Sequence, residues 1–334
     1  MEKQSSWDLN KYMKGNQDMK SEDVMDRIHI DGFVNAGNVA LTYSQSAELS
    51  ELVRAAYNSA KDINSPNLIL ANAGEEGLKG LPEHHPRIAE LLDLVVSSKY
   101  VKNVLSGILG DTYKIWQIDY RRSLPGDRGL HLHQDGFAQL NICIMLTDNP
   151  LGDGATCFVR GSHLVKKRLK KMGLNFPNFL TRYLSVFLTC FSGLRGDIGF
   201  FLNRTWHGRF SNLSKNNQDI ILIGLFPAGA SFRLVDPYHK WTPNFLNAPN
   251  ATTLKYLIDP SINTETLDDG SLYVKPNPNN GSMVVGDCFA KNIESGKTSS
   301  NNFLNSMRLA ILFFILYLIS IGYFVRNQVF NRKK

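Results

Sequence analysis

The stretch TYKIWQIDYRR, residues 112–122, decides the fold class, because the hydrophobic pattern changes its period here. Apolar and polar residues alternate in it, and a period of two is typical of a strand with one buried face. Five further short runs of β-branched and aromatic residues follow, at residues 138–148, 155–160, 197–202, 205–210 and 219–227. Six such runs without helical repeats between them favour a sandwich or jelly roll over a parallel sheet.

The chain before residue 112 has the three-to-four-residue apolar spacing of helices. RIHIDGFVNAG, residues 27–37, predicts a short strand and a turn, and the first helix should be capped by Ser44 or Ser46. The spacing predicts three helices, over residues 46–60, 85–98 and 99–109. The expected fold is therefore mainly β with flanking helices packed outside the sheet.

The composition is that of an ordinary globular protein, with 334 residues, 43% of them hydrophobic and 20% charged. Its four cysteines form no CxxC pair, so we expect neither a disulfide framework nor a zinc site, and a reducing compartment fits best. The amino-terminal residues are polar and lack the apolar core of a secretory signal, so export is not expected.

The far end of the sequence predicts a transmembrane helix. Residues 309–325 are 17 residues without a charge, flanked by Arg308 and Arg326. As a helix this run is about 25 Å long, at the short end of what spans a bilayer. A fully buried terminal helix is the alternative. The lack of a signal predicts a tail-anchored protein with a cytosolic domain, although the basic residues after the run favour the opposite orientation.

A basic segment precedes an apolar and aromatic one in the middle of the chain. Six of the twelve residues from Arg160 to Lys171 are Lys or Arg, and residues 174–194 are rich in Leu and Phe. This order is typical of an interfacial helix on anionic lipid, and a solvated helix face is the alternative. Because no nucleic-acid motif accompanies the charges, we expect no nucleic-acid partner.

These observations predict a series of segments. They are a disordered lead at 1–23, a jelly-roll domain at 24–230 with an insertion at 164–194, an irregular extension rich in Asn and Pro at 231–290, a tether at 291–307, a membrane anchor at 308–326 and a basic tail at 327–334. The insertion lies between strands, where it can serve as a lid.

The stretch HLHQDGFAQL, residues 131–140, contains candidate metal ligands. Residues i and i+2 of a strand point to the same side, so His133 and Asp135 can meet one metal ion. A redox-active Fe(II) ion needs two imidazoles and one carboxylate on one face, and His207 on a later strand is the natural third ligand. His131 is the alternative ligand, although a rim position is expected for it. A lone His-x-Asp pattern recurs by chance, so the surrounding sequence must show whether His133 and Asp135 bind a metal ion.

That context resembles the phytanoyl-CoA dioxygenase family, whose members are iron- and 2-oxoglutarate-dependent oxygenases with a double-stranded β-helix, a cupin-like jelly roll. The resemblance covers about residues 24–230. The stretches that carry it are DGFVNAG (31–37), HPRIAELL (85–92), ILGDTYKIW (108–116), HQD (133–135), LTDNPLGDGATCFVRGSH (146–163) and GDIGFFLNRTWHG (196–208). It implies Fe(II), 2-oxoglutarate and O2 as cofactor and cosubstrates, His133, Asp135 and His207 as iron ligands, and Gln134 as a cosubstrate contact. The carboxylate of Asp135 favours hydroxylation over halogenation.

One position departs from the family pattern. An arginine eleven residues after the distal histidine usually holds the far carboxylate of 2-oxoglutarate, and that position is Gln218 here. A guanidinium grips a carboxylate in two places, which an amide cannot do. Arg209 lies two residues after His207, so it faces the same side and is the first candidate to replace the missing charge. Lys215 is the second, and a site that has lost or exchanged its cosubstrate is the third.

The predicted function is hydroxylation of a C–H bond in a small-molecule substrate. The anchor and the basic insertion favour a lipid-like or acyl substrate at the membrane surface. Small polar metabolites are the alternative substrate class. The alternative is a membrane-tethered pseudoenzyme or jelly-roll binding module without 2-oxoglutarate turnover. We expect His163 to be structural and Trp206 to pack in the interior, and the sequence leaves the facing of four strand residues undecided: Tyr113, Trp116, Gln117 and Asn141.

Overall fold

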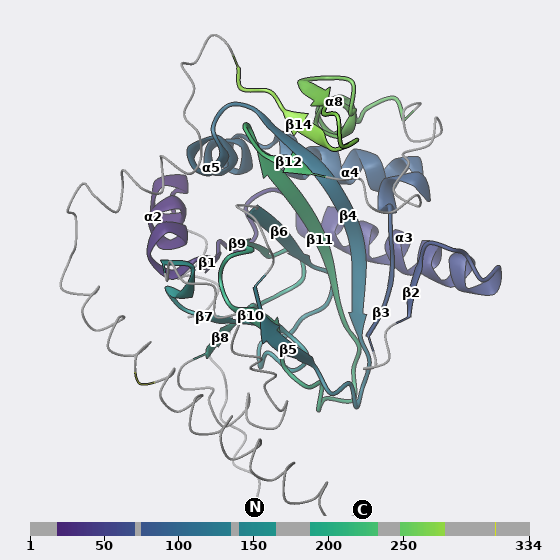
Figure 1. Cartoon of the computed structure of the whole chain (residues 1–334). Helices are drawn as coiled ribbons and strands as arrows, with labels where there is room; N and C mark the ends of the chain where they lie inside the picture. The colour runs from purple at the N-terminus through teal and green to yellow at the C-terminus, as the bar shows by residue number, and fades with distance from the viewer. Residues whose placement is uncertain are drawn as a thin grey trace, which may run out of the picture.

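The computed structural model describes residues 19–70, 75–134, 140–164, 188–232, 248–277 and 311. Two antiparallel sheets form the centre of the protein (Figure 1), in the strand orders β1-β9-β6-β11-β4-β3-β2 and β5-β10-β7-β8. The larger sheet contains β1 (Phe33–Asn35), β2 (Leu68–Leu70), β3 (Glu75–Leu78), β4 (Tyr113–Ser123), β6 (Leu140–Met145), β9 (Ile198–Leu202) and β11 (Gln218–Pro227). The smaller sheet contains β5 (Leu130–His133), β7 (Thr156–Val159), β8 (Leu188–Cys190) and β10 (His207–Arg209).

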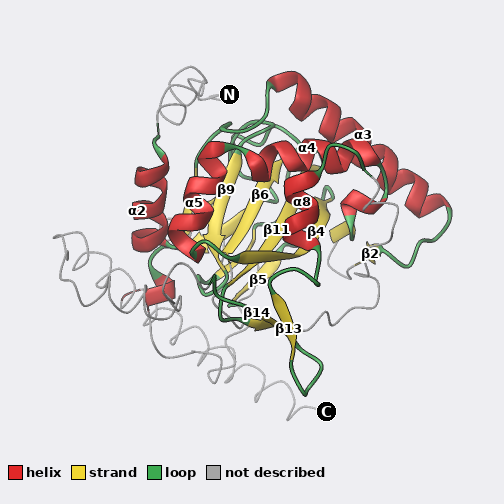
Figure 2. Ribbon diagram, turned by 90° about the horizontal axis from the view of Figure 1, so that it is seen from above, coloured by secondary structure: helices red, strands yellow, loops and turns green. Residues whose placement is uncertain are grey.

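Helices cover one face of the larger sheet, as Figure 2 shows. They are α2 (Ser21–Asp31), α3 (Tyr43–Asp62), α4 (Pro86–Ser97), α5 (Lys99–Leu109) and α8 (Thr252–Ile258), with short 3-10 turns at Leu81–Glu83 and Ser162–Leu164. The main core lies between these helices and the sheet, where Ile142 and Ile144 of β6 are fully buried. Their neighbours Cys143 and Met145 pack on the other face, toward the smaller sheet. The prediction of a mainly β, jelly-roll fold with flanking helices is confirmed.

The first strand is shorter than the sequence pattern predicts. Residues 27–31 belong to helix α2, which begins inside the predicted disordered lead and buries Val24 and Ile28 one turn apart. The helix ends at Gly32, whose φ of 76° is easily adopted only by glycine. Only then does β1 begin and pair with β9. The prediction took the alternating Ile28 and Ile30 for a strand, whereas in the helix Ile30 is 40% exposed and Ile28 shares its buried face with Val24.

Helix α3 is capped by Thr42 rather than by Ser44 or Ser46. The Thr42 hydroxyl accepts a hydrogen bond from the Gln45 N–H, and the Gln45 side chain accepts one from the Thr42 N–H. This reciprocal capping box satisfies two backbone donors at once, which a lone serine would not do. Ser46 lies inside the helix and donates to the Thr42 carbonyl oxygen.

The described part of the extension predicted as irregular contains regular elements. Strands β12 (Ser231–Phe232), β13 (Thr264–Thr266) and β14 (Leu272–Val274) form a small antiparallel sheet. Helix α8 is held at both ends by the main domain. The Asp93 carboxylate accepts from the Leu254 N–H at 2.6 Å, and the ammonium of Lys114 on β4 donates to the carbonyl oxygens of Tyr256 and Asp259 at 2.6 and 2.7 Å.

Lys114 gives the stability of the protein a measurable pH dependence. The residue is 2% exposed, and burial lowers its pKa from 10.5 to about 8. Between these values the unfolded chain holds a proton that the folded chain has released, so this group makes folding more favourable as the pH rises. The neutral amine keeps two N–H donors for the two carbonyl oxygens.

We therefore expect the free energy of unfolding of the parent, relative to Lys114→Met, to rise by about 1–2 kcal/mol between pH 7.5 and 9.5. Urea unfolding of both proteins at the two pH values measures this difference, and the comparison cancels the titration of the tyrosines and cysteines. Parallel pH profiles for the two proteins would contradict it.

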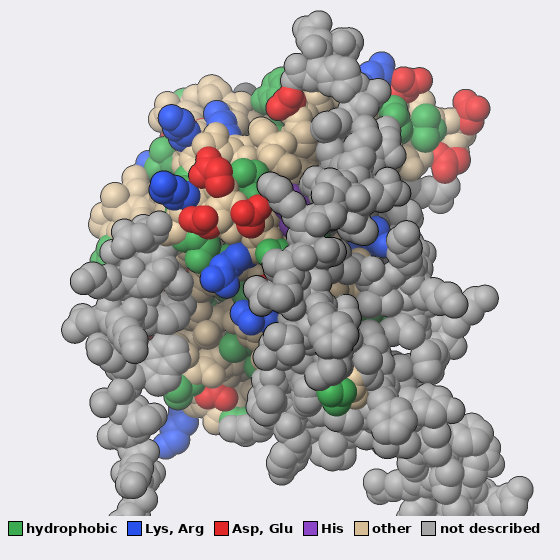
Figure 3. Space-filling view, turned by 90° about the vertical axis from the view of Figure 1, so that its left-hand side faces the viewer, with side chains coloured by type: hydrophobic (Ala, Val, Ile, Leu, Met, Phe, Trp, Pro, Cys, Tyr) green, Lys and Arg blue, Asp and Glu red, His purple; other side chains and the backbone are tan. Residues whose placement is uncertain are grey.

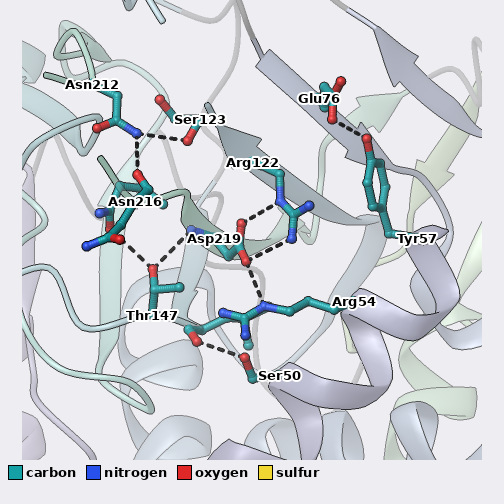
Figure 4. A network of polar contacts seen from close by, with 12 residues as sticks. Ser50, Arg54, Tyr57, Glu76, Arg122, Ser123, Thr147, Asn212, Asn216 and Asp219 are labelled. Carbon is teal, nitrogen blue, oxygen red and sulfur yellow. Dashed lines mark hydrogen bonds and ion pairs between the residues drawn. The ribbon is translucent and has the colours of Figure 1, made fainter. Parts of the chain in front are cut away.

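On the helix-facing side of the larger sheet, Asp219 forms the centre of a buried polar network (Figure 4). Its carboxylate accepts from Arg122 of β4 at 2.9 and 3.2 Å and from Arg54 of α3 at 3.0 Å. The Arg122 guanidinium also stacks over the rings of Tyr57 and Tyr120. This network joins helix α3 to the two central strands.

Several predicted segments lie outside the described residues. These are residues 1–18 of the lead, 165–187 of the insertion, 233–247 and 278–290 of the extension, the tether, the predicted anchor apart from Ile311, and the basic tail. Within the described ranges, no helix combines the length and the apolarity needed to cross a bilayer. On the face shown in Figure 3, acidic and basic side chains of the described part are interspersed.

Candidate functional site

A cavity of about 480 Å³ lies between the two sheets. This volume is within the range of about 300–1,000 Å³ that is typical of small-molecule sites. One part of its wall is apolar, formed by Met145, Phe191, Phe201, Ile220 and Leu222. Another part is polar or charged, and includes Glu75, Gln117, Arg121, His133, Asn141, Asn203, His207, Arg209 and Gln218. The site therefore offers both ligands for a metal ion and an apolar surface for a substrate.

The structure brings His133 and His207 together in this cavity. The two residues are direct cross-strand partners on β5 and β10, and their ring centroids are 4.4 Å apart. Adjacent antiparallel strands place opposite side chains on the same face, so both imidazoles line the same wall. Residues that are distant in sequence thus supply two nitrogen donors at one point.

The hydrogen bond of His207 fixes the tautomer of its ring. Its Nδ1 lies 2.8 Å from the Thr205 carbonyl oxygen, which can only accept, so Nδ1 carries the proton. The neutral ring then presents the lone pair of Nε2. Metal-binding histidines are commonly oriented by such a bond from the other ring nitrogen to a backbone carbonyl. The donor set at His133 and His207 therefore fits an iron site.

Two candidate ligands next to His133 lie beyond what the structure describes. Asp135, predicted as the carboxylate ligand, falls in the gap at 135–139, and His131 is described in its backbone on β5 but not in its side chain. Among the described residues no group of three His, Cys, Asp or Glu side chains is placed to hold a metal ion. The ligand role of Asp135 remains a prediction.

Gln134 does not line the cavity, although a cosubstrate contact was expected of it. Its amide donates to the Arg204 carbonyl oxygen at 2.6 Å. The sequence left the facing of four strand residues undecided. Three of them line the cavity, namely Trp116, Gln117 and Asn141, and the fourth, Tyr113, packs in the core. Trp206 is buried and does not line the cavity, as expected.

A β-bulge explains why neighbouring residues of β4 both face the cavity. On β11, Gly224 pairs with Gln117 and Leu225 with Ile115, so Trp116 is an extra residue in the ladder. The extra residue reverses the alternation of the strand. Ile115 packs in the helix-side core, whereas Gln117 and every second residue after it face the smaller sheet.

His163 of the RGSH turn has structural contacts. Its Nε2 lies 2.9 Å from the His29 carbonyl oxygen, which joins the turn to helix α2. Burial lowers the pKa of His163 to about 4, so the ring is neutral at physiological pH. It does not line the cavity.

Of the three residues considered for the cosubstrate carboxylate, the structure places two at the cavity. Gln218 lines it and accepts a hydrogen bond from the Thr147 hydroxyl at 3.2 Å. Arg209 lines it as well and is buried, with its guanidinium close to two carboxylates, those of Glu75 and Asp127. Lys215 is exposed in the turn before β11 and does not line the cavity.

The sequence reasoning missed a second guanidinium in the cavity. Arg121 of β4 faces it and forms ion pairs with Glu75 and Asp119, at 3.2 and 3.1 Å. The signal was present in the pair Arg121-Arg122, since successive strand residues point to opposite faces. Without the register of β4, however, the sequence did not show which of the two arginines faces the site.

Comparisons with known proteins agree with the fold. Residues 28–218, more than half of the chain, match the sequence model of the family described as Phytanoyl-CoA dioxygenase (PhyH). A search of curated proteins finds no match. Among solved structures, the chain is similar to the non-heme alpha ketoglutarate dependent carbocyclase SnoK from nogalamycin biosynthesis, with 18% identity, a TM-score of 0.50, and coverage of 65% of this chain and 89% of that one.

It is also similar to EctD from S. alaskensis with bound Fe, with 14% identity, a TM-score of 0.51, and coverage of 61% and 75%. At these identities the solved structures establish the fold, and the family match establishes the class of enzyme and its need for Fe(II), 2-oxoglutarate and O2. The chain belongs to the phytanoyl-CoA dioxygenase family and is an iron- and 2-oxoglutarate-dependent oxygenase.

Proposed function

We propose that this oxygenase hydroxylates a C–H bond of a lipid-like or acyl substrate at a membrane surface. In this proposal His133, Asp135 and His207 hold Fe(II), and Arg209 holds the distal carboxylate of 2-oxoglutarate. The observation that carries it is the meeting of His133 and His207 on one wall of a cavity that also contains an arginine and an apolar surface.

The residues of the cavity have distinct tasks in this reaction. Bound iron and 2-oxoglutarate supply the activation of O2 and the oxidising power, which no side chain can provide. The two imidazoles donate lone pairs to the metal, and the Thr205 carbonyl fixes the orientation of the His207 ring. The wall of Phe191, Phe201 and Leu222 excludes water from the reacting carbon atom.

The same apolar wall supports the proposed substrate class. A hydrocarbon segment packed against Met145, Phe201 and Ile220 buries apolar surface, which favours binding by about 25 cal/mol per Å². The uncharged run at 309–325 and the basic segment that begins at Arg160 support a position next to anionic lipid, with the catalytic domain on the cytosolic side. A small polar metabolite is the competing substrate class.

An anaerobic titration of the full-length protein with Fe(II) and 2-oxoglutarate tests the chemistry. We expect the visible charge-transfer band of a 2-oxo acid chelated to Fe(II), and succinate release once O2 is admitted. Adding acyl-CoA, phospholipid or polar metabolite pools then separates the substrate classes, and the acyl and lipid pools should raise succinate release at least about tenfold above the rate without substrate. Absence of the band at saturating 2-oxoglutarate would refute the proposed chemistry. Stimulation by polar metabolites alone would refute the proposed substrate class.

A further inference from the structure

Glu75 joins the two guanidiniums that line the cavity. Its Oε1 lies 3.2 Å from Nη1 of Arg121, and its Oε2 lies 3.2 Å from Nη1 of Arg209. Arg121 belongs to the larger sheet and Arg209 to the smaller one, so one carboxylate bridges the two sheets inside the cavity. The two arginines therefore already form a binding site for a carboxylate, and a side chain of the protein occupies it.

The other carboxylate next to Arg209 is fixed in a different way. Asp127 is fully buried and accepts hydrogen bonds from the Ser123 hydroxyl at 2.7 Å and from the Gly129 N–H at 2.8 Å. Within the described ranges, the polar contacts of the Glu75 carboxylate are to the two guanidiniums. Glu75 can thus leave the arginines without breaking a further hydrogen bond, whereas Asp127 cannot.

The arginines also have unused donors. Among the described residues, the Nε–H groups of Arg121 and Arg209 are buried without a hydrogen-bond acceptor. Nη2 of Arg209 lies 2.8 Å from Asp127 but without hydrogen-bond alignment. Unsatisfied buried donors are costly, so a carboxylate with better alignment would be stabilised here.

The charges of the cluster oppose such a ligand as long as Glu75 stays in place. Arg121 and Arg209 supply two positive charges, and Glu75, Asp119 and Asp127 supply three negative ones. An incoming carboxylate therefore meets a cluster with one excess negative charge. Neutralising or displacing Glu75 removes that excess, and like-charge repulsion is strong in a partly buried site.

The location of the cluster matches the position where the usual arginine is missing. Glu75, Ser123 and Gln218 are cross-strand neighbours on β3, β4 and β11, and all three line the cavity. Arg121 lies two residues from Ser123 on the same face of β4. Its guanidinium therefore comes from the strand next to position 218 and can replace a guanidinium from β11.

We infer that Arg121 and Arg209 together bind the distal carboxylate of 2-oxoglutarate, and that Glu75 is an internal carboxylate which the cosubstrate must displace. This inference rests on the proposed function, because it assigns the cosubstrate to this cavity. Glu75 then sets the affinity for the cosubstrate and raises the concentration of 2-oxoglutarate that the enzyme needs.

Calorimetric titration of the full-length, Fe(II)-loaded protein with 2-oxoglutarate under anaerobic conditions tests this role. We expect Glu75→Gln to lower the Kd about tenfold, because it removes the competing charge, and Arg121→Met to raise it at least about tenfold. Glu76→Gln is the matched control. Glu76 is the next residue on β3 and contacts Tyr57 and Lys61 outside the cavity, so its variant should stay within about twofold of the parent.

A second ligand tests whether the effect of Glu75→Gln on the Kd depends on the distal carboxylate of 2-oxoglutarate. The compound 2-oxopentanoate has the same carbon chain and 2-oxo acid group but no distal carboxylate, so Glu75→Gln should change its Kd less than about twofold. An unchanged or raised Kd for 2-oxoglutarate in Glu75→Gln, or a parental Kd in Arg121→Met, would overturn the inference while the proposed function stands. A parent that binds no 2-oxoglutarate would refute both.

Discussion

Replacing His207 by alanine should abolish iron binding at the cavity and lower the rate of succinate formation by at least about a hundredfold. Loss of a residue that only orients a metal ligand already costs about ten- to a hundredfold, and loss of a ligand costs more. His207 is 6% exposed, and its ring lies next to those of Phe158 and Phe201. No water-exposed side chain can therefore take its place without a rearrangement of the cavity wall.

Metal content after anaerobic loading and gel filtration, together with the charge-transfer band, measures this loss. His84→Gln is the control, because His84 is a partly buried histidine bonded to the Lys79 carbonyl oxygen and does not line the cavity. It should keep the iron content and the band of the parent. Circular dichroism must show that the His207 variant is folded. A folded His207→Ala protein with parental iron content would exclude His207 as a ligand.

Replacing Asp219 by alanine should lower the free energy of unfolding by about 3–5 kcal/mol. The carboxylate is completely buried, and its removal leaves Arg122, whose side chain is 12% exposed, without its counterion. Breaking a buried ion pair from one side is costly because the remaining charge stays desolvated. Figure 4 shows Asp219 between Arg54 of α3 and Arg122 of β4, so the same loss also removes the ion pair between this helix and β11.

Urea unfolding of Asp219→Ala and of Arg54→Met measures how much the buried Asp219 carboxylate and the partly exposed Arg54 each contribute to the free energy of unfolding. Arg54 is 41% exposed on its side chain, so its ion pair is partly screened and its loss should cost at most about 1 kcal/mol. Equal effects of the two substitutions, or a loss below about 1 kcal/mol for Asp219→Ala, would show that the burial of the carboxylate is not decisive.

The fold class followed from the sequence because periodicity reports which faces of an element are buried. The alternation in residues 112–122 predicted β4, and the spacing after Ser98 predicted α5 together with its end at Gly110. Short elements were harder to predict. One helical turn that buries Val24 and Ile28 has the same apolar content as a short strand, and only the contacts with α5 and β9 distinguish the two.

The candidate site could be predicted from the sequence only in part. The convergence of His133 and His207 could be expected from the family resemblance, and their cross-strand pairing agrees with it. The environment of Arg209 could not be predicted from the sequence, because its partners Glu75 and Asp127 come from distant segments. No local pattern encodes such pairing, since it depends on strand order and register.

The extra residue at Trp116 determines what the rest of β4 presents to each side. Downstream of it, odd-numbered positions face the cavity and even-numbered positions face the helices, the reverse of the numbering upstream. Deleting Trp116 would leave Ile115 and Gln117 opposite Leu225 and Gly224 in a regular ladder, so Arg121 would still face the cavity. In an unbulged strand of the same residues that kept Ile115 in the helix-side core, Arg121 would instead face α3 and Arg122 would face the cavity. Which arginine the cavity receives is therefore set by one unpaired residue as much as by the identity of the side chains.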